Sequence, residues 1–345
     1  MAAAKANEVT PGDVAVRRDP SARWVSLLLL GFGVAILAAF AATTNFRQIG
    51  EAMGRIQPSL FGLAIAAVLA QLLVKAARWQ FMVWRLTGTR ISVRFGAISV
   101  IAGVAAGSIT PGRSFEVAKA VMLKGSFGVS LRISTSAMIV ERILDIVFVI
   151  TTFLLAAAFV PSRMVLASHV VLVTIVALVS GSALVVALPA QVQAWAGVLL
   201  RRIPIPEGVR GRVLNLIETF FSSFLVLRQH RTLWPLLGLT AVAAALDIAR
   251  VFTVFRAMGI PLGIALIAFS YLGAAMLGMA LLIPGGVGVT EVSMAGLIAF
   301  LAPGAVLANA ARSAVLLDRF FSYYLLVIAG AGLLIAYHRY RRIFV

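Results

Sequence analysis

Apolar stretches of about 18 or more residues recur along this chain of 345 residues, and they constrain its fold more than any other feature. A helix of roughly 20 apolar residues crosses the hydrocarbon core of a bilayer, and its backbone polar groups are satisfied within the segment. Hydrophobic residues make up 61% of the chain and charged residues only 12%, whereas a soluble domain carries about 25% charge. The sequence therefore predicts an all-α polytopic membrane protein and excludes a soluble enzyme, a nucleic-acid binder and a disulfide-rich secreted module.

The charge of the chain is strongly positive, with 30 Lys and Arg residues against 12 Asp and Glu and a formal net charge of +18. In a membrane protein such an excess marks cytoplasmic loops and attracts anionic lipid headgroups. We therefore expect lipid, and not nucleic acid, as the partner. The chain has no cysteine and only three histidines, which lie far apart in the sequence, so we expect no metal site and no other cofactor.

The basic residues predict the topology, because they concentrate in cytoplasmic segments. Residues 1–22 form a disordered tail and 338–345 a basic tail, both cytoplasmic, and 23–337 form one transmembrane domain in the inner, cytoplasmic membrane. We expect unbroken apolar helices over residues 24–43, 58–84, 133–160, 165–188, 233–257 and 305–336. A basic cluster at the cytoplasmic end of the second helix comprises Lys75, Arg78, Arg85, Arg90 and Arg94. The basic segment 190–231 contains an amphipathic pattern, typical of a helix on the cytoplasmic membrane surface or of a long start to the next span.

Two further apolar segments are interrupted by proline and glycine. These are 95–123, broken around Pro111, and 262–302, broken around Pro284. Irregular backbone at membrane depth is tolerated only where protein or a water-filled cavity covers it. We therefore favour about six full spans plus two broken, re-entrant helical hairpins, and about eight full spans are the alternative.

The two halves of the transmembrane domain, 58–188 and 233–337, share an order of features. Each half has a break with Pro and Gly, an acidic residue shortly after it, and an acid–arginine pair further along, Glu141-Arg142 in the first and Asp318-Arg319 in the second. The predicted topology gives the halves opposite orientations. Two inverted-topology repeats with broken helices are typical of secondary transporters, which bind their substrates near the midplane.

Half of the acidic residues fall within apolar segments, where a charge at the bilayer centre costs roughly 2.5–3.5 kcal/mol. These residues are Glu116, Glu141, Asp145, Asp247, Glu291 and Asp318. Arginines lie close to several of them along the same helices, so we expect ion pairs that either gate a transport path or lock helices together. The expected gating or ion-pair residues are Glu141, Arg142, Asp145, Asp247, Arg250, Arg312, Asp318 and Arg319.

The two breaks form the expected substrate site. A helix that begins after Gly112 presents unpaired N–H groups and a positive dipole end to an anion, and the guanidinium of Arg113 suits phosphate. In the second break Thr290 is placed to cap the following helix, and the glycines either expose backbone to a ligand or permit close helix packing. The expected substrate-binding residues are Thr110, Arg113, Glu116, Gly285, Gly286, Thr290 and Glu291.

These motifs resemble the transmembrane region of the lysylphosphatidylglycerol synthases, the multiple peptide resistance factor family, and its stand-alone flippase-like relatives. The resemblance covers nearly the whole chain, from about residue 25 to 337. It rests on Thr110-Pro111-Gly112-Arg113 with Glu116, Glu141-Arg142 with Asp145, Pro284-Gly285-Gly286-Val287-Gly288 with Glu291, and Asp318-Arg319. It implies movement of a lipid with a polar headgroup between leaflets. Because the full synthases carry a soluble aminoacyl-transfer domain after this region, we expect translocation without synthesis.

We therefore expect a lipid flippase and not an enzyme. Its substrate would be a phospholipid, an aminoacyl-phosphatidylglycerol or a polyprenyl-phosphate-linked lipid that passes through a central charged cavity, and interior arginines favour a phosphate headgroup. A membrane-embedded transferase acting on a lipid-linked substrate and a non-transporting scaffold of a lipid-synthesis complex are the alternatives. The expected partners are membrane lipids with a phosphate headgroup, a second copy of the chain and lipid-biosynthesis enzymes.

Overall fold

The structure is a computed structural model that describes residues 56–108, 117–160, 189–202, 207–227, 229–281 and 283–339, with a few positions between 28 and 54. In these residues every regular element is helical. Among the described residues, four helices are long and apolar enough to cross a membrane: Pro58–Thr87, His230–Ala257, Pro284–Leu301 and Asn309–Arg339. The predicted all-α polytopic membrane fold is confirmed. The predicted helix 165–188, and part of 24–43, lie outside the described residues.

In its described part, the first half contains a long helix, two short helices on either side of the first break, and a second long helix. They are α3 (Pro58–Thr87), α4 (Val93–Gly107), α5 (Val117–Phe127) and α6 (Leu131–Ala157). Pro58 opens α3, where a missing N–H costs nothing, and Gly88 ends it at a φ of 70°, which glycine adopts without strain. Hydroxyls of Ser92 and Ser130 accept the backbone N–H groups of Phe95 and Ile133 and thereby cap α4 and α6.

The second half repeats this order. It contains α10 (His230–Ala257), α11 (Ile264–Ala280), the short 3₁₀ turn η3 (Pro284–Gly286), α12 (Val289–Leu301), α13 (Ala305–Arg319), the π turn η4 (Phe320–Tyr324) and α14 (Leu325–Arg339). The helices α13 and α14 follow one another through η4 and together correspond to α6. Single π turns inside helices are frequent at functional sites.

The two halves pack through α3 and α10, which run antiparallel. The N–H of Gln57, just before α3, donates to the carbonyl of Ala257 at the end of α10 (3.0 Å). At the other end, Nε of Arg85 donates to Oγ1 of Thr232 (2.7 Å). The helix α4 packs against α14, and α11 packs against α6. A short helix of each half therefore packs against a long helix of the other half. This reciprocal packing between antiparallel halves is the arrangement of an inverted repeat.

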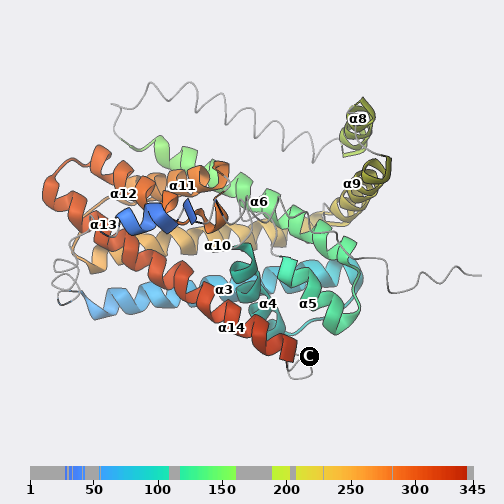
Figure 1. Ribbon diagram of the computed structural model, residues 1–345, viewed down its shortest axis with the longest axis horizontal. Helices are drawn as coiled ribbons and strands as arrows, with labels where there is room; N and C mark the ends of the chain where they lie inside the picture. The colour runs from blue at the N-terminus through green and yellow to red at the C-terminus, as the bar shows by residue number, and fades with distance from the viewer. Residues whose placement is uncertain are drawn as a thin grey trace, which may run out of the picture.

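The short helices of the two halves lie at opposite ends of the bundle (Figure 1). The helices α4, α5, α11 and α12 contain 15, 11, 17 and 13 residues. At 1.5 Å per residue, each is at most about 25 Å long. Each is therefore shorter than the hydrocarbon core of about 30 Å, whereas α3 and α10 exceed it.

The basic segment between the halves forms two separate helices, α8 (Pro189–Arg202) and α9 (Glu207–Leu227). Phe224 and Leu227 of α9 are buried in the hydrophobic core of the first half, and α9 contacts α6 and α3. Because α9 ends before α10 begins at His230, the alternative of one long start to the next span is wrong. Figure 1 shows α8 standing away from the main bundle.

Candidate functional site

The first half buries an arginine with two carboxylates. Arg78 of α3 is 1% exposed. Its Nη2 lies 2.8 Å from Oε1 of Glu141, and its Nη1 lies 2.6 Å from Oδ1 of Asp145. Nη1 also donates to Oγ1 of Thr240 on α10 (2.9 Å). Because α3, α6 and α10 all contribute, this cluster ties the two halves together.

A second cation reaches the same carboxylate from the short helix α5. Nζ of Lys119 lies 3.2 Å from Oε2 of Glu141, and the Lys119 side chain is 2% exposed. The ammonium also lies 5.3 Å from the ring centroid of Trp79, within the range of a cation–π interaction. Glu141 is thus held between two cations from different helices.

The second half contains an equivalent cluster around Arg250 of α10. Its guanidinium forms an ion pair with Asp318 of α13 and with Asp247, one turn earlier on α10, at 3.2 Å. Nη2 also donates to the hydroxyl of Tyr271 on α11 (3.3 Å). The predicted pair between Asp247 and Arg250 is therefore formed, while the main partner of Asp318 is Arg250.

The π turn places a further buried ion pair against the second break. Nε of Arg319 donates to Oε1 of Glu291 on α12 (2.7 Å), and Nη2 donates to the carbonyl of Gly285 (3.3 Å). The hydroxyl of Tyr324, which the π turn turns toward α12, donates to the same Oε1 (2.8 Å). Arg319 also stacks over the ring of Tyr323 at 4.3 Å. Glu291 is 0% exposed, so this buried network fixes the second break to the end of α13 and to the π turn.

The glycines of the second break have conformations that few other residues adopt. Gly285, Gly286 and Gly288 have φ values of 66°, 66° and 81°, and a Cβ on Gly286 would lie 2.6 Å from Oγ1 of Thr290. Of the two roles expected for these glycines, backbone exposure to a ligand and close packing, close packing therefore applies to both Gly285 and Gly286, which are buried. The expectation that Thr290 caps α12 is wrong, because Gly288 is the N-cap residue and no side chain caps this end.

Two cavities of similar size lie on the two sides of these clusters. One, the α6–α11 cavity, has a volume of about 160 Å³ and is lined by α6, α10, α11, Gly286 and Thr290. The other, the α3–α4 cavity, has a volume of about 150 Å³ and is lined by α3, α4, α6, Lys119 and the π-turn region. Each cavity lies mainly against the first two helices of one half and a long helix of the other. They are therefore counterparts in the inverted repeat.

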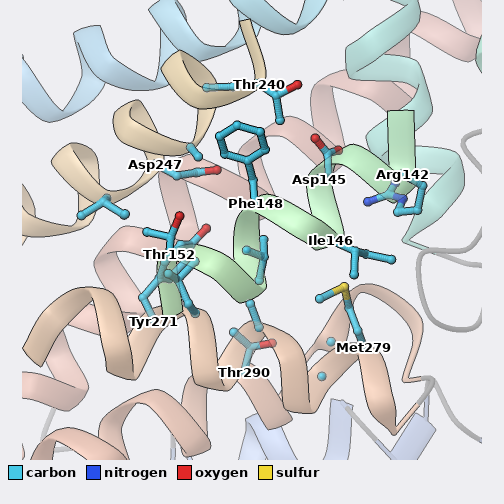
Figure 2. Close-up of a pocket in the computed structure, with 18 of the residues that line it drawn as sticks. Arg142, Asp145, Ile146, Phe148, Thr152, Thr240, Asp247, Tyr271, Met279 and Thr290 are labelled. Atoms are coloured by element: carbon cyan, nitrogen blue, oxygen red, sulfur yellow. The ribbon is translucent and has the colours of Figure 1, made fainter. Parts of the chain in front are cut away.

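Six residues line both cavities, and we call them the central residues. They are Lys75, Arg142, Asp145, Asp247, Tyr271 and Arg319. Figure 2 shows Arg142, Asp145, Asp247 and Tyr271 around the α6–α11 cavity, together with apolar side chains such as Phe148. The carboxylates are accessible from the cavities, since the side chains of Asp145 and Asp247 are 29% and 26% exposed. The two cavities thus meet at a charged centre with an amphipathic surround.

Cations outnumber carboxylates around the α3–α4 cavity. Its lining contains the cationic residues Lys75, Arg78, Lys119, Arg142, Arg250 and Arg319, and the carboxylates Glu141, Asp145 and Asp247. The excess favours an anionic ligand group, because arginine and lysine are the usual ligands of phosphate.

The structure corrects the predicted ion pair between Asp318 and Arg319 and adds a partner for the acids of α6. Asp318 pairs with Arg250 and Arg319 pairs with Glu291, while Glu141 and Asp145 both pair with Arg78 of α3. Neighbouring residues on a helix point about 100° apart, so adjacent charges do not face each other. Across the facing helix surfaces, by contrast, an arginine reaches its carboxylate directly.

Other predicted site residues separate in space. Arg312 lines a different, mostly apolar pocket beside Phe40 and α12, so it does not belong to the central group. Glu291 lines neither central cavity, because Arg319 and Tyr324 hold its buried carboxylate, and its role in substrate binding stays a prediction. Thr110, Arg113 and Glu116 lie outside the described residues, and their role stays a prediction.

Sequence reasoning missed Arg78, Lys75 and Lys119 as interior cations, because the first two were assigned to a cytoplasmic helix end. The helix α3 continues to Thr87 and buries Arg78 instead. The repeat contains the missing signal. Lys75 and Arg78 are the 18th and 21st residues of α3, and Asp247 and Arg250 are the 18th and 21st residues of α10.

Comparisons with known proteins agree with this architecture. The family model of the lysylphosphatidylglycerol synthase transmembrane region matches residues 23–330. Two proteins of Methanothermobacter thermautotrophicus, both named UPF0104 membrane protein, are 26% and 23% identical over 79% and 88% of this chain and 81% and 93% of their own lengths. A UPF0104 membrane protein of Pyrococcus horikoshii is 26% identical over 90% of this chain and 97% of its own. The chain therefore belongs to the family defined by the transmembrane region of lysylphosphatidylglycerol synthases, as its motifs and membrane fold indicate.

Proposed function

We propose that this protein moves a lipid with a phosphate-bearing headgroup between the two leaflets of the membrane. The observation that carries the proposal is the pair of polar cavities that meet at six shared residues between antiparallel halves. Transporters built from inverted repeats bind their substrates at such a centre and expose it alternately to the two sides. Membership of a family named after a lipid synthase supports a lipid as the substrate.

The size of the cavities supports a headgroup as the part that enters. Each has a volume of about 150–160 Å³, whereas sites for drug-sized ligands have volumes of about 300–1,000 Å³. A phosphate with a small polar group fits this space, and two acyl chains do not. The chains remain in the surrounding lipid, where α3, α6, α10 and α14 expose large apolar side chains such as Leu69, Leu155, Val242 and Ile328.

The topology is part of the proposal. The pairs α4–α5 and α11–α12 act as re-entrant hairpins from opposite sides, since α4, α5 and α11 are too short to span the core singly and the pairs lie at opposite ends of the bundle. The segment Pro284–Leu301 reaches a spanning length only because it joins the turn η3 to α12, and the glycine at position 285 breaks it. The protein would then lie in the cytoplasmic membrane with both termini in the cytoplasm. The headgroup changes sides and undergoes no chemical step, so the protein is not an enzyme in this proposal.

The test is a leaflet-accessibility assay in proteoliposomes. Purified protein is reconstituted with headgroup-labelled lipids, and a membrane-impermeant quencher reports the fraction in the outer leaflet over time. The panel contains phosphatidylglycerol, phosphatidylethanolamine, an aminoacyl-phosphatidylglycerol, a polyprenyl phosphate and a phosphate-free glycolipid. We expect wild-type protein to accelerate movement of at least one phosphate lipid and not of the glycolipid.

Arg142→Gln tests whether the centre carries this activity, because Arg142 lines both cavities. The matched control is Arg202→Gln, at an exposed position at the end of α8. We expect Arg142→Gln to lose lipid movement while it elutes and unfolds like the control. If wild-type protein moves no lipid of the panel, the proposal is refuted. Formation of a new lipid product in the same vesicles would then favour the transferase, and its absence the scaffold.

A further inference from the structure

Lys75 is unusual among the interior cations. It lies in the C-terminal part of α3, one turn before Arg78. Its side chain is partly buried and lines both cavities. Its ammonium makes no hydrogen bond or ion pair with any residue in the described part of the chain. Charged side chains within membrane segments almost always pair with each other or with backbone carbonyls, so an unpaired ammonium at this depth requires an explanation.

Other cations around the cavities are already neutralised. Arg78 and Lys119 share Glu141, Arg250 holds Asp318, and Arg319 holds Glu291. Each of these pairs joins two helices and holds them in place. The positive charges of these four residues are therefore balanced by protein carboxylates. The ammonium of Lys75, by contrast, lines both cavities and has no partner in the described part of the chain.

We infer that Lys75 is the residue that binds the headgroup phosphate, and that the ligand is an anionic phosphodiester or phosphomonoester. A lysine ammonium is a compact charge with three rotatable donors on a flexible stem, which lets it follow a phosphate over a few ångströms. Because Lys75 lines both cavities, one ammonium can hold the phosphate as the headgroup passes from one cavity to the other. This inference rests on the proposed function for the transport step only, since binding at Lys75 is measurable without transport.

The first experiment measures binding to the purified protein in neutral detergent. Dihexanoyl-phosphatidylglycerol is titrated by native mass spectrometry, with dihexanoylglycerol as the phosphate-free comparison. We expect Lys75→Gln to weaken binding of the phosphate lipid by about 10- to 100-fold, the usual value of a hydrogen bond to a charged group. Lys75→Arg should retain most of the affinity. Lys124→Gln, the same change at an exposed lysine of α5, should leave it unchanged.

A second experiment separates loss of charge from misfolding. The chain has no cysteine, so Lys75→Cys introduces a single thiol. Aminoethyl methanethiosulfonate restores a positive charge at that position, and ethyl methanethiosulfonate adds a neutral group of similar length. We expect only the aminoethyl adduct to recover phosphate-lipid binding, in one and the same protein preparation.

The outcomes distinguish this inference from the proposed function. Binding by Lys75→Gln at wild-type affinity, or equal recovery with both thiol reagents, overturns the role of Lys75 even if wild-type protein moves lipid. Wild-type protein that binds neither lipid also overturns it. If binding depends on Lys75 but no lipid of the panel crosses the vesicle membrane, the site stands and the transport proposal falls.

Discussion

Replacing Arg78 by methionine tests whether its cluster locks the two halves together. Methionine keeps much of the side-chain volume and removes the charge. The change leaves Glu141 and Asp145, whose side chains are 8% and 29% exposed, without their shared cation. Breaking a buried ion pair by removing one partner costs about 3–5 kcal/mol. Because Lys119 still holds Glu141 and Asp145 retains some contact with the cavity, we expect a loss at the lower end, about 3 kcal/mol.

A second variant tests the electrostatic origin of this loss. The cluster contains two cations and two carboxylates, so Arg78→Met leaves one negative charge in excess. Adding Asp145→Asn removes that excess and leaves the pair of Glu141 and Lys119 balanced. We expect the double variant to be more stable than Arg78→Met alone, with a coupling of at least about 1 kcal/mol.

The assay is equilibrium unfolding in mixed micelles with increasing dodecyl sulfate, followed by far-ultraviolet circular dichroism. Arg202→Met, at an exposed position, is the control and should change the free energy of unfolding by less than about 0.5 kcal/mol. A loss for Arg78→Met as small as that of the control would refute the locking role. Simple additivity of Arg78→Met and Asp145→Asn would refute the electrostatic explanation.

Three further changes are measured by the same unfolding titration. Gly330→Ala should lower the free energy of unfolding by about 1–3 kcal/mol, because its Cβ would meet the carbonyl oxygen of Ile101 on α4. Gly332→Ala on the same helix is the control: its Cβ meets nothing within 4 Å, so the change should be neutral or stabilising by up to about 1 kcal/mol. Equal effects of the two changes would contradict the close packing of α4 and α14. Gly285→Ala should cost at least about 1 kcal/mol, since its φ is 66° and the new methyl group would meet a tyrosine hydroxyl of the π turn, and an unchanged midpoint would show that the break relaxes freely. Tyr324→Phe should cost about 1.5–3 kcal/mol by removing its 2.8 Å hydrogen bond to a buried carboxylate; no loss would mean that this bond contributes nothing.

The helices were predictable because length and hydropathy decide them. The expected helix 58–84 is found at Pro58–Thr87, and 233–257 at His230–Ala257. The interruptions in 95–123 and 262–302 also separate pairs of short helices. Proline and glycine act through the local backbone, so their effect is readable in one segment of sequence. The π turn at Phe320–Tyr324 was not predictable in this way, because no proline or glycine marks it.

The ion pairs were harder to predict, because they depend on which helix faces which. Six acidic residues could be located in apolar segments, but their partners lie 63 to 68 residues away in the pairs of Arg78 with Glu141 and of Arg250 with Asp318. Spacing within one helix suggested Arg142 and Arg319 as partners for the acids beside them. Only the packing of α3 against α6 and of α10 against α13 shows that each arginine comes from another helix of the same half.

The two halves have the same residue type at the position that forms the buried ion pairs and opposite charges at the position where the cavities meet. The 21st residue of both α3 and α10 is an arginine, and each binds a carboxylate on the last long segment of its own half. The 18th residue is Lys75 in one helix and Asp247 in the other, and both line both cavities. Like charges at these two positions would repel each other across a shared centre of low dielectric constant. Opposite charges avoid that cost and also make the two halves chemically different. In the transport that we propose, a headgroup arriving from one cavity would therefore meet the cation of α3 and the carboxylate of α10 in the reverse order to a headgroup arriving from the other cavity.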